Sequence, residues 1–461
     1  MFQLTVNNYR SFIQQDFDFK RINIIIGENS SGKSSLLKLF LLLKQTMNNP
    51  NDANLVLNGD FVDLGNYRET VYYQKSSKNI AFKFAFGKEY LPYFLSYIFG
   101  REKNQNGLPD KETKYLESIL TKADKEPTSL RYEVTKELHL HSTINTTIEN
   151  QKIGTLKIVI KTEPEERERV LLRTYPICRL EYTRKEDGKL YVFDDIDYVK
   201  DGFMSIIMAQ GLENQTKRSR KIFYEIAFLL ITQNYLEDEL GKMQFINPLN
   251  NVPKRIYFQK DTKMNYKNSD LEKLVGYVDG GKVSSDFLKT FYQILVDFGI
   301  ADDIKVIGNK NLAVLELRVK IKDLLSNIID VGYGVSLQLP ILFEIFNAER
   351  HQGKTFLIEQ PEVHLHPKLQ AKFIEVLLKM GRKNSYFIET HSEHIVRMLQ
   401  VIVKNKKYGI SAKDVSIYYC KRVNKKTEVT RHDITSDGYL STPFPEGFFD
   451  TSYTLAKELL F

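Results

Sequence analysis

The stretch Gly27-Glu28-Asn29-Ser30-Ser31-Gly32-Lys33-Ser34 organises the rest of this chain. It fits the pattern G-x-x-x-x-G-K-[ST], a glycine-rich loop that wraps a phosphate group. A β-branched run at residues 22–26 precedes the loop and predicts a buried strand. A helix-forming and largely apolar run at residues 33–47 follows and predicts a buried helix. This order favours a phosphate-binding loop over a Gly/Ser-rich turn that only precedes a core helix.

Each fixed position of the loop has a physical role. The two glycines allow the backbone to approach an anion without a Cβ clash, and the backbone amides at the positive helix N-terminus face that anion. Lys33 is expected to reach the β- and γ-phosphates, and Ser34 to offer its hydroxyl to Mg²⁺. The loop therefore predicts a nucleotide and Mg²⁺ as ligands. The predicted nucleotide-binding residues of this segment are Gly27, Asn29, Ser30, Ser31, Gly32, Lys33, Ser34 and Ser35.

Composition bounds the class of protein. The 461 residues are 42% hydrophobic and 27% charged, which is ordinary for a globular protein of one to three domains. The net charge of +8 permits a nucleic-acid partner without establishing one. Two cysteines indicate a reducing compartment, and no secretion signal or membrane-length apolar run is visible. We expect a cytoplasmic protein that does not associate with a membrane.

The order of the predicted elements indicates an α/β fold that is split in sequence. Residues 1–87 and 301–436 would form the two parts of one nucleotide-binding head, and the second part shows βαβα order. Residues 88–300 show strands followed by helices, as in an inserted α+β lobe. Heptads are not sustained there, so we expect a compact lobe without a coiled coil. Residues 437–461 would be a separate tail element.

An acidic partner for Mg²⁺ is expected at the carboxyl end of a neighbouring strand. The apolar run at residues 355–358 predicts such a strand, and it ends in Glu359-Gln360-Pro361-Glu362. Glu359 is therefore the predicted acidic metal ligand, together with the hydroxyl of Ser34. Two further strands are predicted at residues 17–20 and 70–74.

The run Ile358-Glu359-Gln360-Pro361-Glu362-Val363-His364-Leu365-His366-Pro367 resembles a family motif, I-E-[EQ]-P-E-x-H-L-H-P. This motif belongs to the ABC-type ATPases of the structural-maintenance (SMC), RecF and Rad50 group. Within that group the chain looks closest to bacterial ATPases related to the overcoming-lysogenisation nucleases. The resemblance implies an ABC-type P-loop ATPase head with an inserted α+β lobe.

Three other segments are similar to motifs of the same group: residues 8–12, 331–338 and 387–394. The resemblance implies that Arg10 lies beside the nucleotide and that His391 lies near the γ-phosphate. It also implies that Ser336 and the amides near Gly334 contact the γ-phosphate bound to a second subunit. Leu337 departs from the family pattern, because it separates Ser336 from the glutamine that usually follows. Gln74 occupies the approximate position of the family's glutamine loop, although a surface glutamine would fit the pattern equally well.

One departure concerns catalysis. Most ABC ATPases have a glutamate after the metal-binding acid, and this glutamate polarises the attacking water, whereas this chain has Gln360. An amide can orient a water but cannot take its proton. Either Glu362 supplies the carboxylate or hydrolysis is slow, and we favour slow hydrolysis. The predicted catalytic residues are Glu359, Gln360, Glu362 and His391.

A metal-dependent hydrolase is an alternative interpretation of the same segments. Its ligands would be two histidine pairs with two acids, namely His364, His366, His391, His394, Glu359 and Glu389. This alternative leaves the phosphate loop without a role, so the nucleotide site is preferred.

The resemblance also suggests a biological setting. No nuclease motif is visible after residue 436, so the chain resembles stand-alone ATPases of bacterial anti-phage systems, such as the Septu ATPase. Such a protein would form a homodimer or higher oligomer around its ATP sites and act through a separately encoded nuclease or toxin. The alternative is a RecF- or Rad50-like repair ATPase that binds DNA directly. The tail at residues 442–450 is similar to the W-P-x-G-F-F-D element of a C-terminal domain of unknown function.

Overall fold

The computed structural model divides the chain into two compact units. The first unit comprises Met1–Phe19, Ser35–Lys242 and Arg422–Glu428, and the second comprises Lys20–Ser34, Met243–Lys421 and Val429–Phe461. The residues that the structure describes are 2–48, 55–75, 77–92, 94, 110–136, 142–162, 176–193, 220–246, 252–258, 270–279, 284–309, 314–351, 353–445, 448–449 and 457–458.

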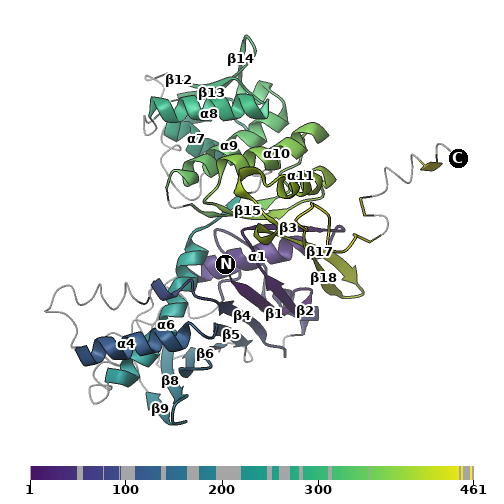
Figure 1. Cartoon of the computed structure of the whole chain (residues 1–461). Helices are drawn as coiled ribbons and strands as arrows, with labels where there is room; N and C mark the ends of the chain where they lie inside the picture. The colour runs from purple at the N-terminus through teal and green to yellow at the C-terminus, as the bar shows by residue number, and fades with distance from the viewer. Residues whose placement is uncertain are drawn as a thin grey trace, which may run out of the picture. The chain divides into compact units, whose positions relative to one another are not determined.

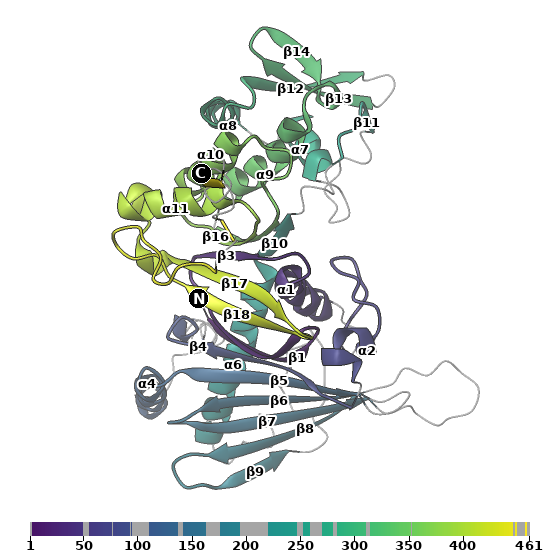
Figure 2. The ribbon, with the colours of Figure 1, turned by 90° about the vertical axis from the view of Figure 1, so that its right-hand side faces the viewer.

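The first unit is built on an eight-stranded sheet in which every neighbouring pair is antiparallel. Its strand order is β2-β1-β4-β5-β6-β7-β8-β9, and Figure 2 shows β5 to β9 side by side as a broad meander. Alternating side chains of these strands are buried, which is the pattern of a sheet covered on one face. The strands are β1 (Gln3–Tyr9), β2 (Phe12–Asp18), β4 (Ile80–Phe86), β5 (Thr128–Lys136), β6 (Ser142–Asn150), β7 (Gly154–Thr162), β8 (Pro176–Arg184) and β9 (Leu190–Phe193).

Helix α6 (Arg220–Gly241) packs on the buried face of this sheet and contacts β5, β6 and β7. The centre of its Phe228 ring lies 5.6 Å from that of Tyr90 and 5.1 Å from that of Phe94. Helix α4 (Asp110–Ala123) contacts α6 in turn. The predicted helix after the phosphate loop is confirmed as α1 (Lys33–Met47), and most of it belongs to this unit.

One predicted strand has the wrong bounds and another is wrong. The strand predicted at residues 17–20 exists as β2, but β2 begins at Phe12 and ends at Asp18, and the turn before it has left-handed backbone at Asn8 and Arg10. The strand predicted at residues 70–74 is a short helix, α2 (Tyr67–Thr70), followed by a 3₁₀ turn, η1 (Tyr72–Gln74). Asn66 and Glu69 form a capping box, and this local hydrogen bonding starts a helix where β-branched and aromatic residues suggested a strand.

The second unit contains a six-stranded sheet in the order β10-β15-β16-β3-β17-β18. The first five strands are parallel to their neighbours. The phosphate-loop strand β3 therefore lies at the centre, separated from β15 by β16. The strands are β3 (Ile22–Gly27), β10 (Met243–Ile246), β15 (Thr355–Glu359), β16 (Ser385–Glu389), β17 (Val415–Val423) and β18 (Lys426–His432). Met243–Ile246 falls within the predicted lobe of residues 88–300 and pairs with β15.

Apolar helices and a smaller sheet complete the second unit, and Figure 1 shows α9, α10 and α11 close to β15. Phe343 of α9 meets Phe287 and Phe291 of α8 within one continuous core. The elements are α7 (Asp270–Asp279), α8 (Ser285–Phe298), α9 (Tyr333–Glu349), α10 (Pro367–Met380), α11 (Glu393–Lys404), β11 (Tyr257–Phe258), β12 (Asp303–Asn309), β13 (Val314–Ile321), β14 (Leu324–Asn327), and the 3₁₀ turns η3 (Ile328–Asp330), η4 (Lys407–Gly409) and η5 (Ala412–Asp414).

The α/β fold class is therefore confirmed. None of the helices in the described part of the chain has the length and apolar character needed to cross a membrane. The division of the chain at residues 87, 300 and 436 stays a prediction.

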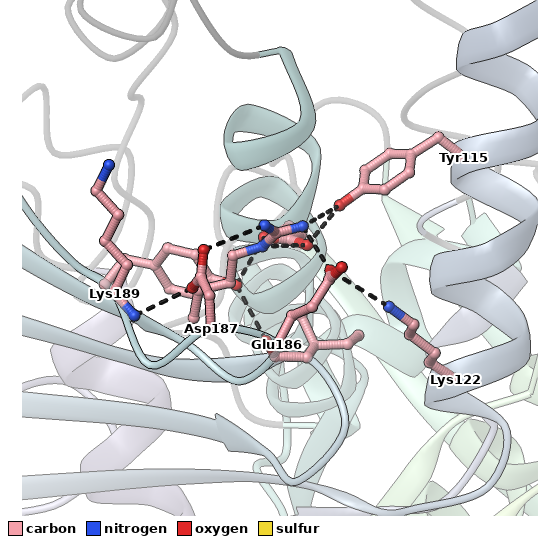
Figure 3. Close-up of polar contacts among 9 residues, drawn as sticks. Tyr115, Lys122, Glu186, Asp187 and Lys189 are labelled. Atoms are coloured by element: carbon pink, nitrogen blue, oxygen red, sulfur yellow. Dashed lines mark hydrogen bonds and ion pairs between the residues drawn. The ribbon is translucent and has the colours of Figure 1, made fainter.

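A buried carboxylate joins three elements of the first unit. Glu225 of α6 is 3% exposed and accepts hydrogen bonds from the hydroxyls of Tyr115 and Tyr182 and from Nε of Arg184. Burial and the Glu225 charge raise the pKa of Tyr115. Figure 3 shows Tyr115 and Lys122 approaching from α4, and Glu186 and Asp187 from the turn after β8. A carboxylate so deep in an apolar layer requires this complete set of donors.

Replacing Arg184 with methionine should destabilise the first unit. Arg184→Met leaves the Glu225 charge buried without its cation, which costs about 3 kcal/mol in the free energy of unfolding. The control is Arg179→Met on the same strand, because the side chain of Arg179 is 50% exposed in its pair with Glu181. That exposed pair should contribute below about 1 kcal/mol. Urea unfolding followed by circular dichroism measures both, and equal losses would contradict the role given to Glu225.

Candidate nucleotide site

The phosphate loop leaves β3 at a glycine that no other residue can replace without strain. Gly27 has φ +144°, and a Cβ placed there would lie 2.0 Å from the carbonyl oxygen of Cys420 on β17. The loop continues through Ser30 and Gly32, which also have positive φ. Asn29 and Ser30 are exposed at its tip, while Ser31 is fully buried. The loop is therefore held by close backbone contact with β17.

Lys33 begins α1 and turns back onto the loop. It is 4% exposed, and its Nζ donates to the carbonyl oxygens of Gly27 at 3.0 Å and Glu28 at 2.7 Å. Desolvation lowers the pKa of this ammonium group, and the nearby charge of Glu389 opposes that effect. A cation held under the curve of the loop is placed to meet the phosphates of a nucleotide.

Ser34 donates a hydrogen bond to a carboxylate that the sequence had not assigned to the nucleotide site. Its hydroxyl lies 2.8 Å from Oε1 of Glu389 at the end of β16. Glu389 is 1% exposed, and burial raises its pKa to about 7. The sequence held one usable signal, since Glu389 ends an apolar strand in the same way as Glu359.

Parallel register brings the acids together. Glu359 and Glu389 are direct neighbours across β15 and β16, and Glu389 also pairs with Ile25 of β3. The amide of Gln360 donates to the carbonyl oxygen of Glu389 at 2.8 Å. Gln360 itself has φ +44°, a left-handed conformation that costs energy for a residue with a Cβ. Glu359 and Gln360 are both half-buried at this edge of the sheet.

Glu362 and His391 meet at the same edge. Oε1 of Glu362 accepts a hydrogen bond from the backbone amide of His391 at 2.6 Å. Burial raises the pKa of Glu362, and this amide opposes the effect. The imidazole of His391 has an exposed surface, but partial desolvation and the charge of Lys33 hold its pKa below the usual value. The four predicted catalytic residues therefore lie on adjacent strand ends.

The segment that resembles the family's signature motif begins α9. Ser336 is fully buried, and its hydroxyl donates to the carbonyl oxygen of Tyr333 at 3.1 Å. A Cβ at Gly334 would lie 2.9 Å from the carbonyl oxygen of His364, so this helix end is close to the loop after β15. Nε2 of Gln338 donates to the carbonyl oxygen of Pro361 at 2.6 Å. The exposed side chain at this end is Tyr333, whereas Ser336 faces the interior.

Three predicted residues belong to the first unit and not to the second, which holds the loop up to Ser34. The amide of Arg10 donates to the carbonyl oxygen of Thr70 at 2.6 Å. Gln74 is exposed, with φ +55°. Ser35 is half-buried at the start of α1.

The alternative metal centre receives no support. Among the residues that the structure describes, no three His, Cys, Asp or Glu side chains form a group that could hold a metal ion. His366 instead caps α10, where its Nδ1 accepts from the amide of Lys368 at 3.3 Å. His364 and His394 are exposed.

Sequence comparison agrees with the phosphate-loop geometry. Residues 1–396 match the family model described as an AAA ATPase domain. The chain belongs to this ATPase family. Nucleotide binding is therefore expected of the chain, and the segment around Lys33 and Ser34 lies within the matched residues. Residues 410–459 of this AAA ATPase chain match a second family model, described as a protein of unknown function (DUF3696). The matched range includes the tail at residues 442–450, for which the sequence analysis noted a similarity to a domain of unknown function.

No curated protein matches the chain. The solved structures with a loose likeness include heads of SMC proteins. One is an SMC head bound to the C-winged helix domain of ScpA, with a TM-score of 0.41, 10% identity, and coverage of 94% of this chain and 98% of that one. Another is the SMC head domain from Thermotoga maritima, with a TM-score of 0.34, 9% identity, and coverage of 93% and 97%. A third is the Pyrococcus furiosus Smc head bound to the C-terminal domain of ScpA, with a TM-score of 0.38, 10% identity, and full coverage of both chains.

The close approach at Gly27 yields a test of the loop geometry. Gly27→Ala should destabilise the protein by about 3 kcal/mol, because the new Cβ collides with backbone that cannot rotate away. The control is Gly241→Ala, where a Cβ would meet only Cε of Met47 at 4.0 Å. Thermal unfolding compares the two variants. Equal melting temperatures would contradict the contact between the loop and β17.

Proposed function

We propose that this ATPase is a nucleotide-driven switch subunit of a bacterial anti-phage defence complex. In this proposal two copies close around two ATP molecules in a head-to-head dimer, or assemble into a higher oligomer, in the manner of SMC- and Rad50-like ABC ATPases. A separately encoded nuclease or toxin would read the closed state. The similarity of residues 358–367 to the overcoming-lysogenisation group supports this setting.

The observation that carries the switch is the position of Gln360. It stands directly after Glu359, at the edge where Lys33, Ser34 and His391 converge, and has no carboxylate with which to take a proton from water. The other carboxylate of this segment, Glu362, is held through Oε1 by the backbone amide of His391. Such a site is suited to holding ATP for long periods, so that occupancy rather than turnover conveys the signal.

Magnesium fits the oxygen donors at this edge. The hydroxyl of Ser34 and the carboxylate of Glu359 are the residues that would hold it, and hard oxygen donors are what Mg²⁺ prefers. Buried Oε2 of Glu389 has no hydrogen-bond partner in the described part of the chain, which marks a place for a further polar ligand. When bound, the ion would neutralise charge on the β- and γ-phosphates.

Restoring the usual carboxylate should accelerate hydrolysis. Gln360→Glu is expected to raise kcat about 100-fold, the size of a typical general-base contribution. Gln14→Glu makes the same charge change at an exposed position of β2 and should leave kcat unchanged. Phosphate release at saturating ATP measures both rates. Rapid turnover in the unmodified protein that also survives Glu362→Gln would refute slow hydrolysis.

Co-purification tests the partner. The gene is expressed with its native neighbours and a tag, and the bound material is identified with and without ATP. We expect a nuclease or toxin in stoichiometric amount that is retained with ATP and lost from Lys33→Ala. Recovery of the chain without such a protein, under both conditions, would contradict the defence complex.

Direct DNA binding is a second candidate, because one surface of the first unit combines aromatic rings with lysines. Nζ of Lys425 lies 4.1 Å from the ring centre of Tyr73, and Nζ of Lys78 lies 5.0 Å from that of Tyr72. Tyr73 is 46% exposed. Rings and cations together suit single-stranded nucleic acid. A steep salt dependence of DNA binding with DNA-stimulated hydrolysis would favour a repair ATPase.

A further inference from the structure

Glu389 is bonded to the loop residue that was expected to bind the metal. Its Oε1 accepts a hydrogen bond from the hydroxyl of Ser34 at 2.8 Å, whereas the sequence analysis paired Ser34 with Glu359. Strand order explains the difference. Because β16 separates β15 from β3, the acid at the end of β16 is nearer in the sheet to the phosphate loop than the acid at the end of β15.

The other oxygen of Glu389 indicates a missing ligand. Oε2 is buried and has no hydrogen-bond partner among the described residues. Bulk water does not satisfy it either, because Glu389 is only 1% exposed. Leaving such an oxygen unsatisfied is costly, and native structures rarely do so without a functional reason. A carboxylate oxygen at a phosphate-loop edge is suited to a hard divalent cation or to a water in its shell.

We propose that Glu389 is a positioning residue for the magnesium–nucleotide complex. It orients the hydroxyl of Ser34 through Oε1 and supports the magnesium ion or its bound water through Oε2. The acidic function expected of Glu359 alone is thus shared between the ends of β15 and β16. This inference rests on the proposed ATP site and adds a residue to it.

A purely structural role predicts a different outcome. If Glu389 served only to hold the start of α1 through Ser34, its loss would weaken nucleotide binding equally with and without magnesium. If Glu389 positions magnesium, its loss should change the metal requirement and leave metal-free binding intact. The measurement therefore has to separate metal dependence from nucleotide affinity.

The experiment titrates a fluorescent ATP analogue onto the full chain in EDTA and at increasing Mg²⁺. Glu389→Gln keeps the shape and an acceptor for Ser34 but removes the charge. We expect the Mg²⁺ concentration that gives half of the full change in analogue affinity to rise at least about tenfold. A loss of this size in metal affinity is usual when a supporting carboxylate of a metal site is removed. The affinity for the analogue in EDTA should stay unchanged, because no metal is present there for Glu389 to support.

Glu344→Gln is the matched control, because Glu344 is also a buried carboxylate of the second unit, 5% exposed, and accepts a hydrogen bond from Gln244. It should leave the Mg²⁺ requirement unchanged. Ser34→Ala and the double variant with Glu389→Gln test coupling, because residues that act together give non-additive effects. Mn²⁺ binding followed by electron paramagnetic resonance provides a readout independent of the analogue.

The outcomes are distinct. An unchanged Mg²⁺ requirement in Glu389→Gln, or additive effects in the double variant, would overturn the role of Glu389 while leaving the ATP site intact. Failure of the unmodified chain to bind the analogue under any condition would overturn the ATP site itself. If Glu389→Gln does not fold, Glu389→Asp keeps the charge but withdraws it by one methylene. Glu389→Asp should then raise the Mg²⁺ requirement, and an unchanged requirement would overturn the proposal.

Discussion

The parallel register of β3, β16 and β15 is the constraint on which this site depends. Parallel strands end at the same edge of a sheet, so Glu359 and Glu389 become neighbours although 30 positions separate them in the sequence. The same register sets Glu389 against β3, and the loop that leaves β3 returns Ser34 to its carboxylate. A change of strand order would separate the acids from the phosphate loop.

Electrostatics at this edge balance two opposing effects. Burial raises the pKa of Glu389 and Glu362 and lowers that of Lys33, because each charged form loses water. The opposite charges of lysine and the acids partly restore the ionised states. The cluster therefore has one cation and several acids in a poorly hydrated setting, which a bound metal–nucleotide complex would rebalance. The left-handed backbone at Gln360 places a further strain in the same few residues.

The first unit also contains a buried carboxylate, which lies beneath its sheet. A wide antiparallel sheet must cover one face, and α6 does so with a continuous apolar surface that includes Phe228. Glu225 lies within that surface and is tolerated because two hydroxyls and a guanidinium satisfy it. The network links α4, α6 and β8, so it adds polar contacts to the apolar packing of both helices on this sheet.

The sequence by itself determined the phosphate loop, the helix at residues 33–47, the acidic strand end at Glu359 and the α/β class. These are local patterns, in which glycine conformation, hydrophobic period and residue spacing act over a few positions. The sequence could not identify Glu389 as the hydrogen-bond partner of Ser34, because that pairing follows from strand order. It also could not predict that Ser336 is buried, because that burial follows from the packing of α9. The strand predicted at residues 70–74 failed for a local reason, since the capping box at Asn66 outweighed residue preference. Only the tertiary structure decided which acid meets the loop, because that choice depends on which strand lies between β3 and β15.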